Sequence, residues 1–218
     1  FIGPSGVGKT TTSLALLEGP YRHCYSRVYV FSPSCAPGID SAWDSWRKHV
    51  KDVMKVPHDE QTMWDTWEPQ ALEEIIERHK KGNAFLKRKG KKKGFVILVL
   101  VDDFADAGDK VMHSSTNVLT SLFVRGRHLG CACWLLSQKL RVVSLLARTN
   151  FCFMLIWRLR NSKELQTIIE ELDSSTDKNT LLQMYRLATN TKHGFWYINL
   201  LNETDHMFYK NFDQRMII

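Results

Sequence analysis

Runs of consecutive apolar residues mark the centre of the predicted fold. Phe95–Val101, Cys131–Leu136 and Phe151–Trp157 are apolar at every position. A strand covered by helices on both faces has this pattern, whereas a strand with one solvent-exposed face alternates between apolar and polar residues. We therefore predict three buried strands over these ranges. A fourth strand is predicted over Arg27–Ser32, which is rich in β-branched and aromatic residues.

Between these strands, apolar residues recur at the three- and four-residue spacing of amphipathic helices. Helices are predicted over Thr12–Leu17, Ser114–Val124, Ser162–Leu172 and Asn179–Ala188, with Ser114 or Ser115 capping the second helix and Gly126 ending it. Strands that alternate with helices form a mostly parallel sheet. A terminal pair of strands follows at Phe195–Leu200 and His206–Phe212. The pattern therefore predicts a single α/β domain over residues 1–218.

Residues 39–79 are predicted to form a helical insert within this domain. Its tryptophans occur in two pairs with helical spacing, which are Trp43 with Trp46 and Trp64 with Trp67. Such a pattern either packs an apolar face against the core or presents an aromatic patch to a partner. A basic loop is predicted to follow over Lys80–Gly94, so that residues 39–94 form one insertion.

The chemistry begins at Gly3–Thr10, which matches the phosphate-binding pattern G-x-x-x-x-G-K-[ST] at all eight positions. Glycines let backbone N–H groups close around phosphate oxygens, and the N-terminus of the next helix adds its positive dipole end. A chance glycine-rich turn is the alternative. Lys9 is expected to reach the β- and γ-phosphates, and Thr10 to ligate Mg²⁺. The predicted nucleotide-binding residues are Gly3, Pro4, Ser5, Gly6, Val7, Gly8, Lys9, Thr10 and Thr11.

Only Phe1 and Ile2 precede this loop. A phosphate loop follows a strand, and a strand takes roughly five residues. We therefore expect the natural chain to continue upstream, where any targeting segment would lie.

Two acidic residues follow the predicted strand at 95–101. Asp102 is expected to hold Mg²⁺ through water. In P-loop proteins whose second strand lies between the phosphate-loop strand and the acid-bearing strand, the next residue polarises the attacking water, and this residue is Asp103 here. Gln138, after the strand at 131–136, would sense the γ-phosphate and orient that water. The alternatives are a turn cap for Asp103 and an ordinary surface residue for Gln138.

The formal net charge of +7 arises in one segment. Arg78–Lys93 contains nine basic residues and no acidic one, which leaves 21 basic and 23 acidic residues elsewhere. The segment is interpreted as a solvated loop, a contact for DNA phosphates or a nuclear import signal. The residues expected to contact DNA are Lys87, Arg88, Lys89, Lys91, Lys92 and Lys93.

The remaining composition excludes two classes of protein. The longest apolar runs are far shorter than the roughly 18 residues of a membrane-spanning helix. Five cysteines without regular spacing indicate a reducing compartment and not a disulfide framework. Cys131 and Cys133 share one face of their strand and are interpreted as small buried residues, since no cluster of metal ligands accompanies them.

Taken in order, these motifs resemble those of the FtsK/HerA superfamily of P-loop ATPases. The resemblance rests on the phosphate loop, Asp102-Asp103 after their strand, Arg125-Gly126-Arg127-His128 before the next strand, Ser137-Gln138 after it, and Arg148-Thr149-Asn150. The chain is most similar to the poxvirus-type branch, the genome-packaging ATPases of large DNA viruses, virophages and Polinton-like elements. It differs in having Asp103 where many members have Glu, and its basic segment matches no motif of the family.

The resemblance implies a P-loop NTPase three-layer sandwich of the additional-strand (ASCE) type with a mostly parallel central sheet. It also implies an oligomeric ring that hydrolyses ATP with Mg²⁺ and moves double-stranded DNA into a preformed capsid. Capsid or portal-type proteins would be partners, and the host nucleus, a cytoplasmic virus factory or the virion would be the location. By position, the roles of Lys9, Thr10, Asp102, Asp103 and Gln138 carry over unchanged. The resemblance adds Arg125 and Arg127 as candidates for the arginine finger, with Arg148 next.

Other nucleotide-binding classes fit less well. A GTPase would show N-K-x-D and D-x-x-G, and the nearest sequence is Asn190-Thr191-Lys192-His193. A small-molecule kinase has no need of an acid pair followed by a glutamine at a strand end. A cellular HerA-like or conjugation-type DNA pump shares every catalytic residue named and stays open. A non-catalytic nucleotide-binding module is the last alternative, which the intact Lys9 and Asp102 disfavour.

Overall fold

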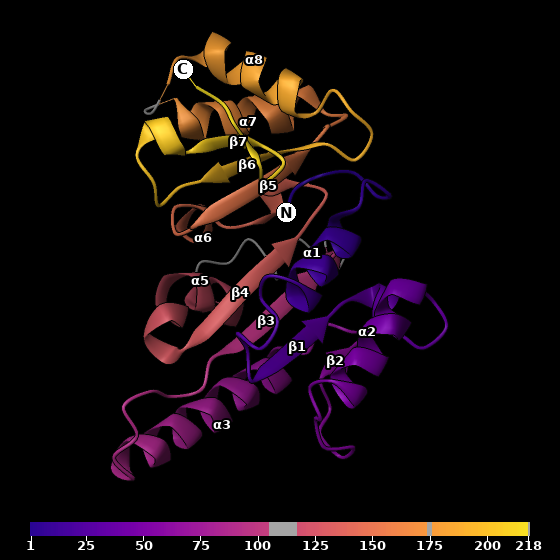
Figure 1. Cartoon of the computed structure of the whole chain (residues 1–218), viewed down its shortest axis with the longest axis vertical. Helices are drawn as coiled ribbons and strands as arrows, with labels where there is room; N and C mark the ends of the chain where they lie inside the picture. Colours follow the sequence, from indigo (N-terminus) through magenta and orange to yellow (C-terminus); the bar gives the residue numbers. More distant parts are fainter. Residues whose placement is uncertain (105–116, 174–175, 218) are drawn as a thin grey trace. The chain divides into compact units, whose positions relative to one another are not determined.

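The computed structural model describes residues 1–104, 117–173 and 176–217. The chain forms two compact units, each with its own sheet (Figure 1). One unit is Thr10–Leu136, and the other combines Phe1–Lys9 with Ser137–Ile218.

The unit Thr10–Leu136 contains a four-stranded parallel sheet with the order β2-β1-β3-β4. Its strands are β1 (Arg27–Phe31), β2 (Met63–Trp64), β3 (Ile97–Asp102) and β4 (Cys131–Leu136). Every residue of β3 is buried, as predicted for a central strand with helices on both faces. Asp102 pairs with Leu136, so β3 and β4 end at the same edge of the sheet.

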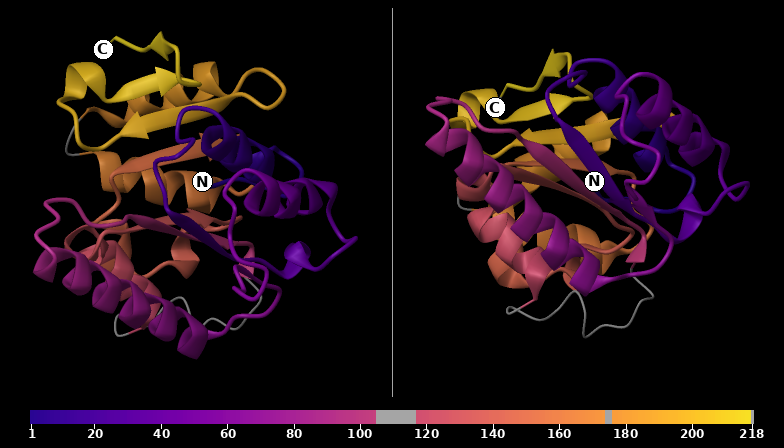
Figure 2. Two further views of the ribbon diagram at one scale, coloured as in Figure 1. Left: turned by 60° about the horizontal axis from the view of Figure 1, so that its bottom comes forward. Right: turned by 90° about the horizontal axis from the view of Figure 1, so that it is seen from below.

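Helices cover both faces of this parallel sheet. The helices are α1 (Lys9–Glu18), α2 (Ser41–Asp52), α3 (Pro69–Arg88) and α5 (Val118–Leu129). Figure 2 shows α3 and α5 on one face and α1 and α2 on the other. Leu14 of α1, Trp43 of α2, Leu72 of α3 and Leu119 of α5 are all buried. The predicted three-layer arrangement is confirmed in this unit.

The tryptophans of the predicted insert are largely buried. Trp43 and Trp46 on α2 are 0% and 1% exposed, which supports an apolar face packed on the core. The helical prediction is wrong for Trp64, which lies in β2 and stacks on Phe31 with ring centroids 4.8 Å apart. A strand of two residues is too short to produce a periodic pattern, so the sequence carried no sign of it.

The other unit contains a four-stranded antiparallel sheet with the order β5-β6-β7-β8. Its strands are β5 (Phe153–Trp157), β6 (Phe195–Asn199), β7 (Phe208–Lys210) and β8 (Gln214–Arg215). The predicted terminal pair is confirmed as β6 and β7. The helices are α6 (Leu145–Arg148), α7 (Ser162–Leu172) and α8 (Lys178–Ala188), with 3-10 turns η3 (Leu140–Val142) and η4 (Thr204–His206). Ile168 of α7 and Leu181 of α8 share one core with Trp196 and Phe208.

Ile2 belongs to this second unit and forms parallel bridges with Ser137 and with Ile156 of β5. Ser137 directly continues the chain from β4, whereas β1 pairs with β2 and β3 in the described residues. The expectation that the second strand lies between the phosphate-loop strand and the acid-bearing strand is therefore wrong. Ile2 instead pairs with Ser137, the residue that directly follows β4.

The basic segment differs from its prediction as a loop. Helix α3 continues to Arg88, so residues 80–88 are helical. Lysine and arginine favour helices nearly as well as leucine does, and the single Gly82 costs only about 1 kcal/mol relative to alanine, which is not enough to end the helix. Phe95 and Val96 also lie outside β3 and are 55% and 41% exposed.

Helix α5 ends later than predicted. Gly126 lies inside it, and the helix ends at Leu129, followed by Gly130 with a φ of 69° as its C-cap. Asn117 caps its start through a hydrogen bond from the backbone N–H of Thr120. The predicted caps Ser114 and Ser115 lie outside the described residues. Among the helices of the described ranges, none combines the length and the apolar character needed to cross a membrane.

Candidate functional site

The phosphate loop runs from Gly3 to Gly8 and leads directly into α1. Gly6 and Gly8 have φ angles of 76° and 106°, which residues with a Cβ atom adopt only with strain. A Cβ on Gly3 would lie 2.9 Å from the Cβ atom of Trp157. The glycines of the motif are therefore required by backbone conformation at two positions and by close packing at the third.

Lys9 is the first residue of α1, and its side chain folds back over the loop. Its ammonium group donates to the carbonyl of Gly3 at 2.8 Å and to that of Pro4 at 3.0 Å. Only 6% of the residue is exposed. A positive charge is thus held against the backbone carbonyls at the start of the loop, where the motif predicts that phosphate oxygens bind.

Thr10 contacts the acidic residue that was predicted to hold Mg²⁺. Its hydroxyl donates to Oδ2 of Asp102 at 3.0 Å, although 92 residues separate the two in sequence. Asp102 is 4% exposed. Because the hydroxyl proton is donated to the carboxylate, a lone pair of the Thr10 oxygen faces other directions and can bind a cation. A hydroxyl and a carboxylate are oxygen ligands that suit Mg²⁺.

Asp103 has an unusual backbone conformation. Its φ is 53°, a left-handed value that few residues other than glycine adopt, although aspartate and asparagine tolerate it best. Its N–H donates to the Leu136 carbonyl at 3.0 Å, and its neighbours Asp102 and Phe104 are both buried. This conformation directs Asp103 away from the course of β3. Strained residues of this kind occur often at functional sites.

Gln138 is exposed, and the residue before it is fixed beside the phosphate loop. Ser137 donates its N–H to the Phe1 carbonyl at 2.9 Å and accepts the Gly3 N–H at 3.1 Å. The Ser137 hydroxyl also donates to the Lys139 carbonyl at 2.9 Å. The backbone just before Gln138 is therefore held next to the start of the loop, and the role of Gln138 as a sensor stays a prediction.

The candidate finger arginines fall into two groups. Arg125 and Arg127 are exposed on α5, and they flank the buried Gly126, where a Cβ would lie 2.4 Å from the Cys131 carbonyl. Residues two apart on a helix point to nearly opposite sides. Arg148 instead forms an ion pair with Glu171, with Nε and Oε1 3.0 Å apart at an angle that does not make a hydrogen bond.

A residue that sequence reasoning missed also contacts the loop. His193 follows α8, and its Nδ1 lies 3.0 Å from the Val7 carbonyl oxygen. The two residues are 186 positions apart, and no motif marks the histidine. The pairing of Ile2 with β5, and the bond from the Trp157 indole to the His193 carbonyl, bring this part of the chain to the phosphate loop.

Comparison with known proteins identifies relatives of the chain. The model of the family described as Poxvirus A32 protein matches residues 1–214. The chain belongs to this family. Comparison with the curated proteins finds no match.

Solved structures similar to this A32-family chain include a viral packaging NTPase, EssC and a conjugation coupling protein. The genome packaging NTPase B204 from Sulfolobus turreted icosahedral virus 2, in complex with AMPPCP, has a TM-score of 0.55 and 11% identity, and the match covers 92% of this chain and 90% of B204. EssC from Geobacillus thermodenitrificans has a TM-score of 0.53 and 17% identity over 77% of this chain and 33% of EssC. The pCW3 conjugation coupling protein TcpA has a TM-score of 0.57 and 13% identity over 92% of this chain and 56% of TcpA.

These similarities show the fold of the A32-family chain, which is that of P-loop NTPases. The chain spans most of B204 but only about a third of EssC and just over half of TcpA. The resemblance to the poxvirus-type branch that the sequence motifs indicated is confirmed by the family match.

The basic segment of the A32-family chain consists of the end of α3, up to Arg88, and the connection that leads from it to β3. All nine of its basic residues are exposed. Asn83 on α3 holds the returning chain, since its side-chain oxygen accepts the Phe95 N–H at 2.8 Å and its amide donates to the Phe95 carbonyl at 3.1 Å. Lys89 also lies over the Phe85 ring, 5.7 Å from its centroid. The charges are thus carried on a folded projection beyond the sheet (Figure 1).

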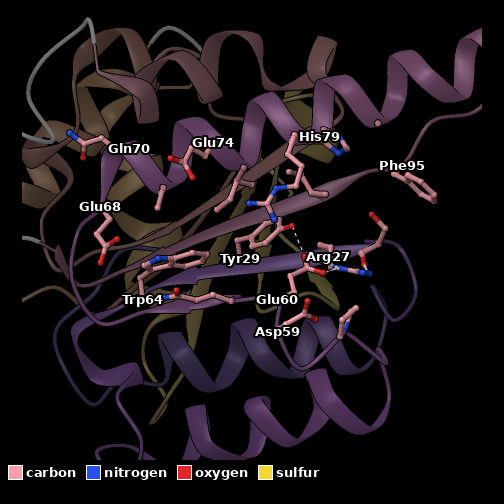
Figure 3. Close-up of a pocket in the computed structure, with 18 residues that line it drawn as sticks. Arg27, Tyr29, Asp59, Glu60, Trp64, Glu68, Gln70, Glu74, His79 and Phe95 are labelled. Carbon is pink, nitrogen blue, oxygen red and sulfur yellow. Dashed lines mark hydrogen bonds and ion pairs between the residues drawn. The ribbon is translucent and has the colours of Figure 1, made fainter.

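A cavity of about 860 Å³ lies along the β1–β2 side of the parallel sheet, beneath α3. Glu60 joins two side chains there, since it accepts hydrogen bonds from Arg27 at 2.8 Å and from the Tyr29 hydroxyl at 2.8 Å (Figure 3). Burial and the bond to Glu60 raise the pKa of Tyr29. None of the residues predicted for the catalytic site lines this cavity.

Proposed function

We propose that this chain is the ATP-hydrolysing subunit of a motor that moves double-stranded DNA into a viral capsid. The observation that carries the proposal is the hydrogen bond of 3.0 Å between Thr10 and Asp102. It joins the phosphate motif to the acid-bearing strand in the way a Mg²⁺–nucleotide site requires. The membership of a family of poxvirus A32 proteins favours genome packaging as the task of the motor.

Each residue of the site has a defined task in this proposal. Lys9 and the loop N–H groups bind the β- and γ-phosphates, and the Thr10 hydroxyl and Asp102 hold Mg²⁺, which would neutralise charge on the phosphate oxygens. The carboxylate of Asp103 accepts a proton from the attacking water. Gln138 orients that water through its amide. The phosphoryl group leaves ADP in line with the attack.

Two further parts come from outside one subunit. An arginine of a neighbouring subunit, Arg125 or Arg127, completes the site in a homo-oligomeric ring. Double-stranded DNA is bound partly by the basic segment, and capsid or portal-type proteins anchor the ring. The protein would act where the virus assembles, in the nucleus or in a cytoplasmic virus factory, or it would be associated with the virion.

A conjugation-type DNA pump is the second candidate, because the fold is also similar to that of TcpA, a conjugation coupling protein. Both motors would hydrolyse ATP at the same residues. They differ in their docking partner, which is a procapsid for a packaging motor. A nuclease-protection assay with empty capsids distinguishes the two, because only packaging protects DNA.

The basic test is ATP hydrolysis by the purified chain with and without double-stranded DNA. Lys9→Ala should abolish ATP binding and turnover, since it removes the ammonium group inside the loop. Lys163→Ala is the matched control, because Lys163 is exposed at the start of α7 and far along the chain from the motif. Equal turnover in wild type and Lys9→Ala would contradict the proposal.

A further inference from the structure

The contact between His193 and Val7 defines which atom carries the imidazole proton. The Val7 carbonyl oxygen can only accept a hydrogen bond, and Nδ1 lies 3.0 Å from it. Nδ1 must therefore carry a proton and donate it. The histidine thus acts on the phosphate loop as a hydrogen-bond donor.

The direction of this bond determines the orientation of the next peptide group. In a trans peptide, the carbonyl of Val7 and the N–H of Gly8 point in opposite directions. A carbonyl held toward His193 therefore keeps the Gly8 N–H on the other side of the peptide plane. Gly8 directly precedes α1, so this N–H is among the groups that bind phosphate in such loops. With a φ of 106°, Gly8 has little steric restraint of its own.

The backbone of His193 is anchored within the same unit by a second hydrogen bond. Its carbonyl accepts a hydrogen bond of 3.2 Å from the indole N–H of Trp157. Trp157 is 1% exposed, and its backbone N–H donates to Ile2 at 2.9 Å. The φ of His193 is 63°, a left-handed value that the surrounding bonds maintain. A left-handed backbone held by these bonds, in the short connection between α8 and β6, suits a residue whose side chain has a task.

We propose that His193 is the positioning residue of the phosphate loop, holding the Val7–Gly8 peptide so that its N–H faces the bound phosphates. This inference rests on the nucleotide binding proposed above. It adds a residue that lies outside the phosphate-loop motif and the acid pair. His193 acts through Val7 and does not touch the reacting atoms.

The left-handed backbone allows a matched pair of variants. Glycine and asparagine both tolerate a φ of 63°, so neither His193→Gly nor His193→Asn adds backbone strain. Asparagine has an amide nitrogen near the position of Nδ1 and can donate to Val7, whereas glycine cannot. His193→Ala is less informative because it combines loss of the donor with strain. Thermal unfolding of both variants shows whether either one fails to fold.

The readout is the dissociation constant for ATP and, separately, for tripolyphosphate, which has no base or sugar. We expect His193→Gly to weaken both by roughly three- to tenfold, the size of one lost hydrogen bond, and His193→Asn to stay within about twofold of wild type. Equal affinities in the two variants would overturn the proposal. A loss for ATP with none for tripolyphosphate would also overturn it, because it would place His193 at the base.

An independent measurement separates this inference from the proposed function. Nitrogen-15 spectra of labelled histidine report which ring nitrogen is protonated, and they need no nucleotide. We expect a proton on Nδ1 of His193, and an Nδ1 without a proton would overturn the hydrogen bond. If wild type itself bound neither ATP nor tripolyphosphate, the proposed function would fail while the tautomer remained as found.

Discussion

Asp103 donates its backbone N–H to the Leu136 carbonyl at 3.0 Å while its own φ is 53°. The bond joins the residue after β3 to the last residue of β4, so both strand ends are fixed where the acid leaves the sheet. A left-handed turn at this point gives the short aspartate a direction that an extended strand would not. This relationship determines how the water-activating role can be tested.

The first prediction concerns Asp103→Asn. Asparagine tolerates the left-handed backbone as well as aspartate does, so the fold and ATP binding should be unchanged. The amide cannot accept a proton as a carboxylate can, so turnover should fall by about 10²–10⁴. Steady-state hydrolysis and equilibrium binding of ATP measure the two effects. Wild-type turnover in this variant would remove the assigned role.

The second prediction concerns the arginine finger. Arg125→Ala and Arg127→Ala change exposed side chains and should leave stability within about 0.5 kcal/mol. A finger supplied from a neighbour contributes roughly 10³–10⁵ in rate, so one of the two variants should lose most of its turnover. Because the two side chains leave α5 on opposite sides, we expect the effects to differ strongly.

Mixed rings test whether the finger acts between subunits. An inactive finger variant combined with inactive Lys9→Ala should recover part of the activity, since some interfaces then hold an intact finger and an intact loop. Arg148→Ala is compared with the two finger variants in the same assays. It removes the ion pair with Glu171, so we expect it to lower the unfolding temperature, which the finger variants should not do. No recovery in rings that demonstrably contain both subunits would argue against a finger in trans.

The third prediction concerns the basic segment and double-stranded DNA. Each phosphate contact contributes about −0.9 to the slope of log affinity against log salt. Replacing Lys87, Arg88, Lys89, Lys91, Lys92 and Lys93 with Gln should therefore flatten the slope by several units while ATP turnover without DNA stays constant.

A smaller pair of variants controls for net charge. The first variant changes three lysines of the basic segment to Gln, which are Lys91, Lys92 and Lys93. The control variant changes three exposed lysines elsewhere to Gln, which are Lys48, Lys51 and Lys163. Both remove three charges, and we expect the first to flatten the slope of log DNA affinity against log salt more than the control does. Identical slopes for the two sets would leave a solvated segment or an import signal. Localisation of a fluorescent fusion then separates those two.

The fourth prediction concerns thiol reactivity. Burial raises the pKa of the Cys131 thiol to about 11 and also raises that of Cys35. A raised pKa lowers the thiolate fraction, and the thiolate is the reactive form. Iodoacetamide at pH 8 should therefore modify the exposed Cys24 and Cys152 in the native protein and leave Cys35 and Cys131 unmodified. Mass spectrometry of native and denatured samples measures this, and rapid native labelling of Cys131 would contradict its burial.

The sequence predicted those elements whose pattern is continuous. The strand at 131–136 and the helix at 162–172 agree with the structure residue for residue, because each shows one uninterrupted apolar or helical pattern. The predicted helix end at Gly126 was wrong because this glycine is needed inside α5, where the helix approaches β4 so closely that no Cβ fits. The predicted loop over residues 80–88 was wrong because a solvated helix and a solvated loop can have the same charged composition.

The candidate site divides in a similar way. The position of Lys9 over the loop and the contact of Thr10 with Asp102 follow from the spacing of the phosphate-loop motif and from an acid at a strand end, while their roles in phosphate and Mg²⁺ binding stay predictions. His193 was not predictable, because its contact with Val7 depends on the pairing of distant segments and leaves no local pattern. The order of strands was mistaken for the same reason, since pairing partners are not encoded in the periodicity of either strand.

The two-way bond between Asn83 and Phe95 has a consequence for how the basic segment would meet a polyanion. A flexible run of lysines must give up conformational freedom when it binds, and that loss weakens the association. Here the connection is closed at both ends of residues 83–95, so much of that freedom is already lost when the chain folds. The backbone that carries these charges is therefore partly ordered before any polyanion binds, so less conformational entropy would be lost on binding than for an open loop.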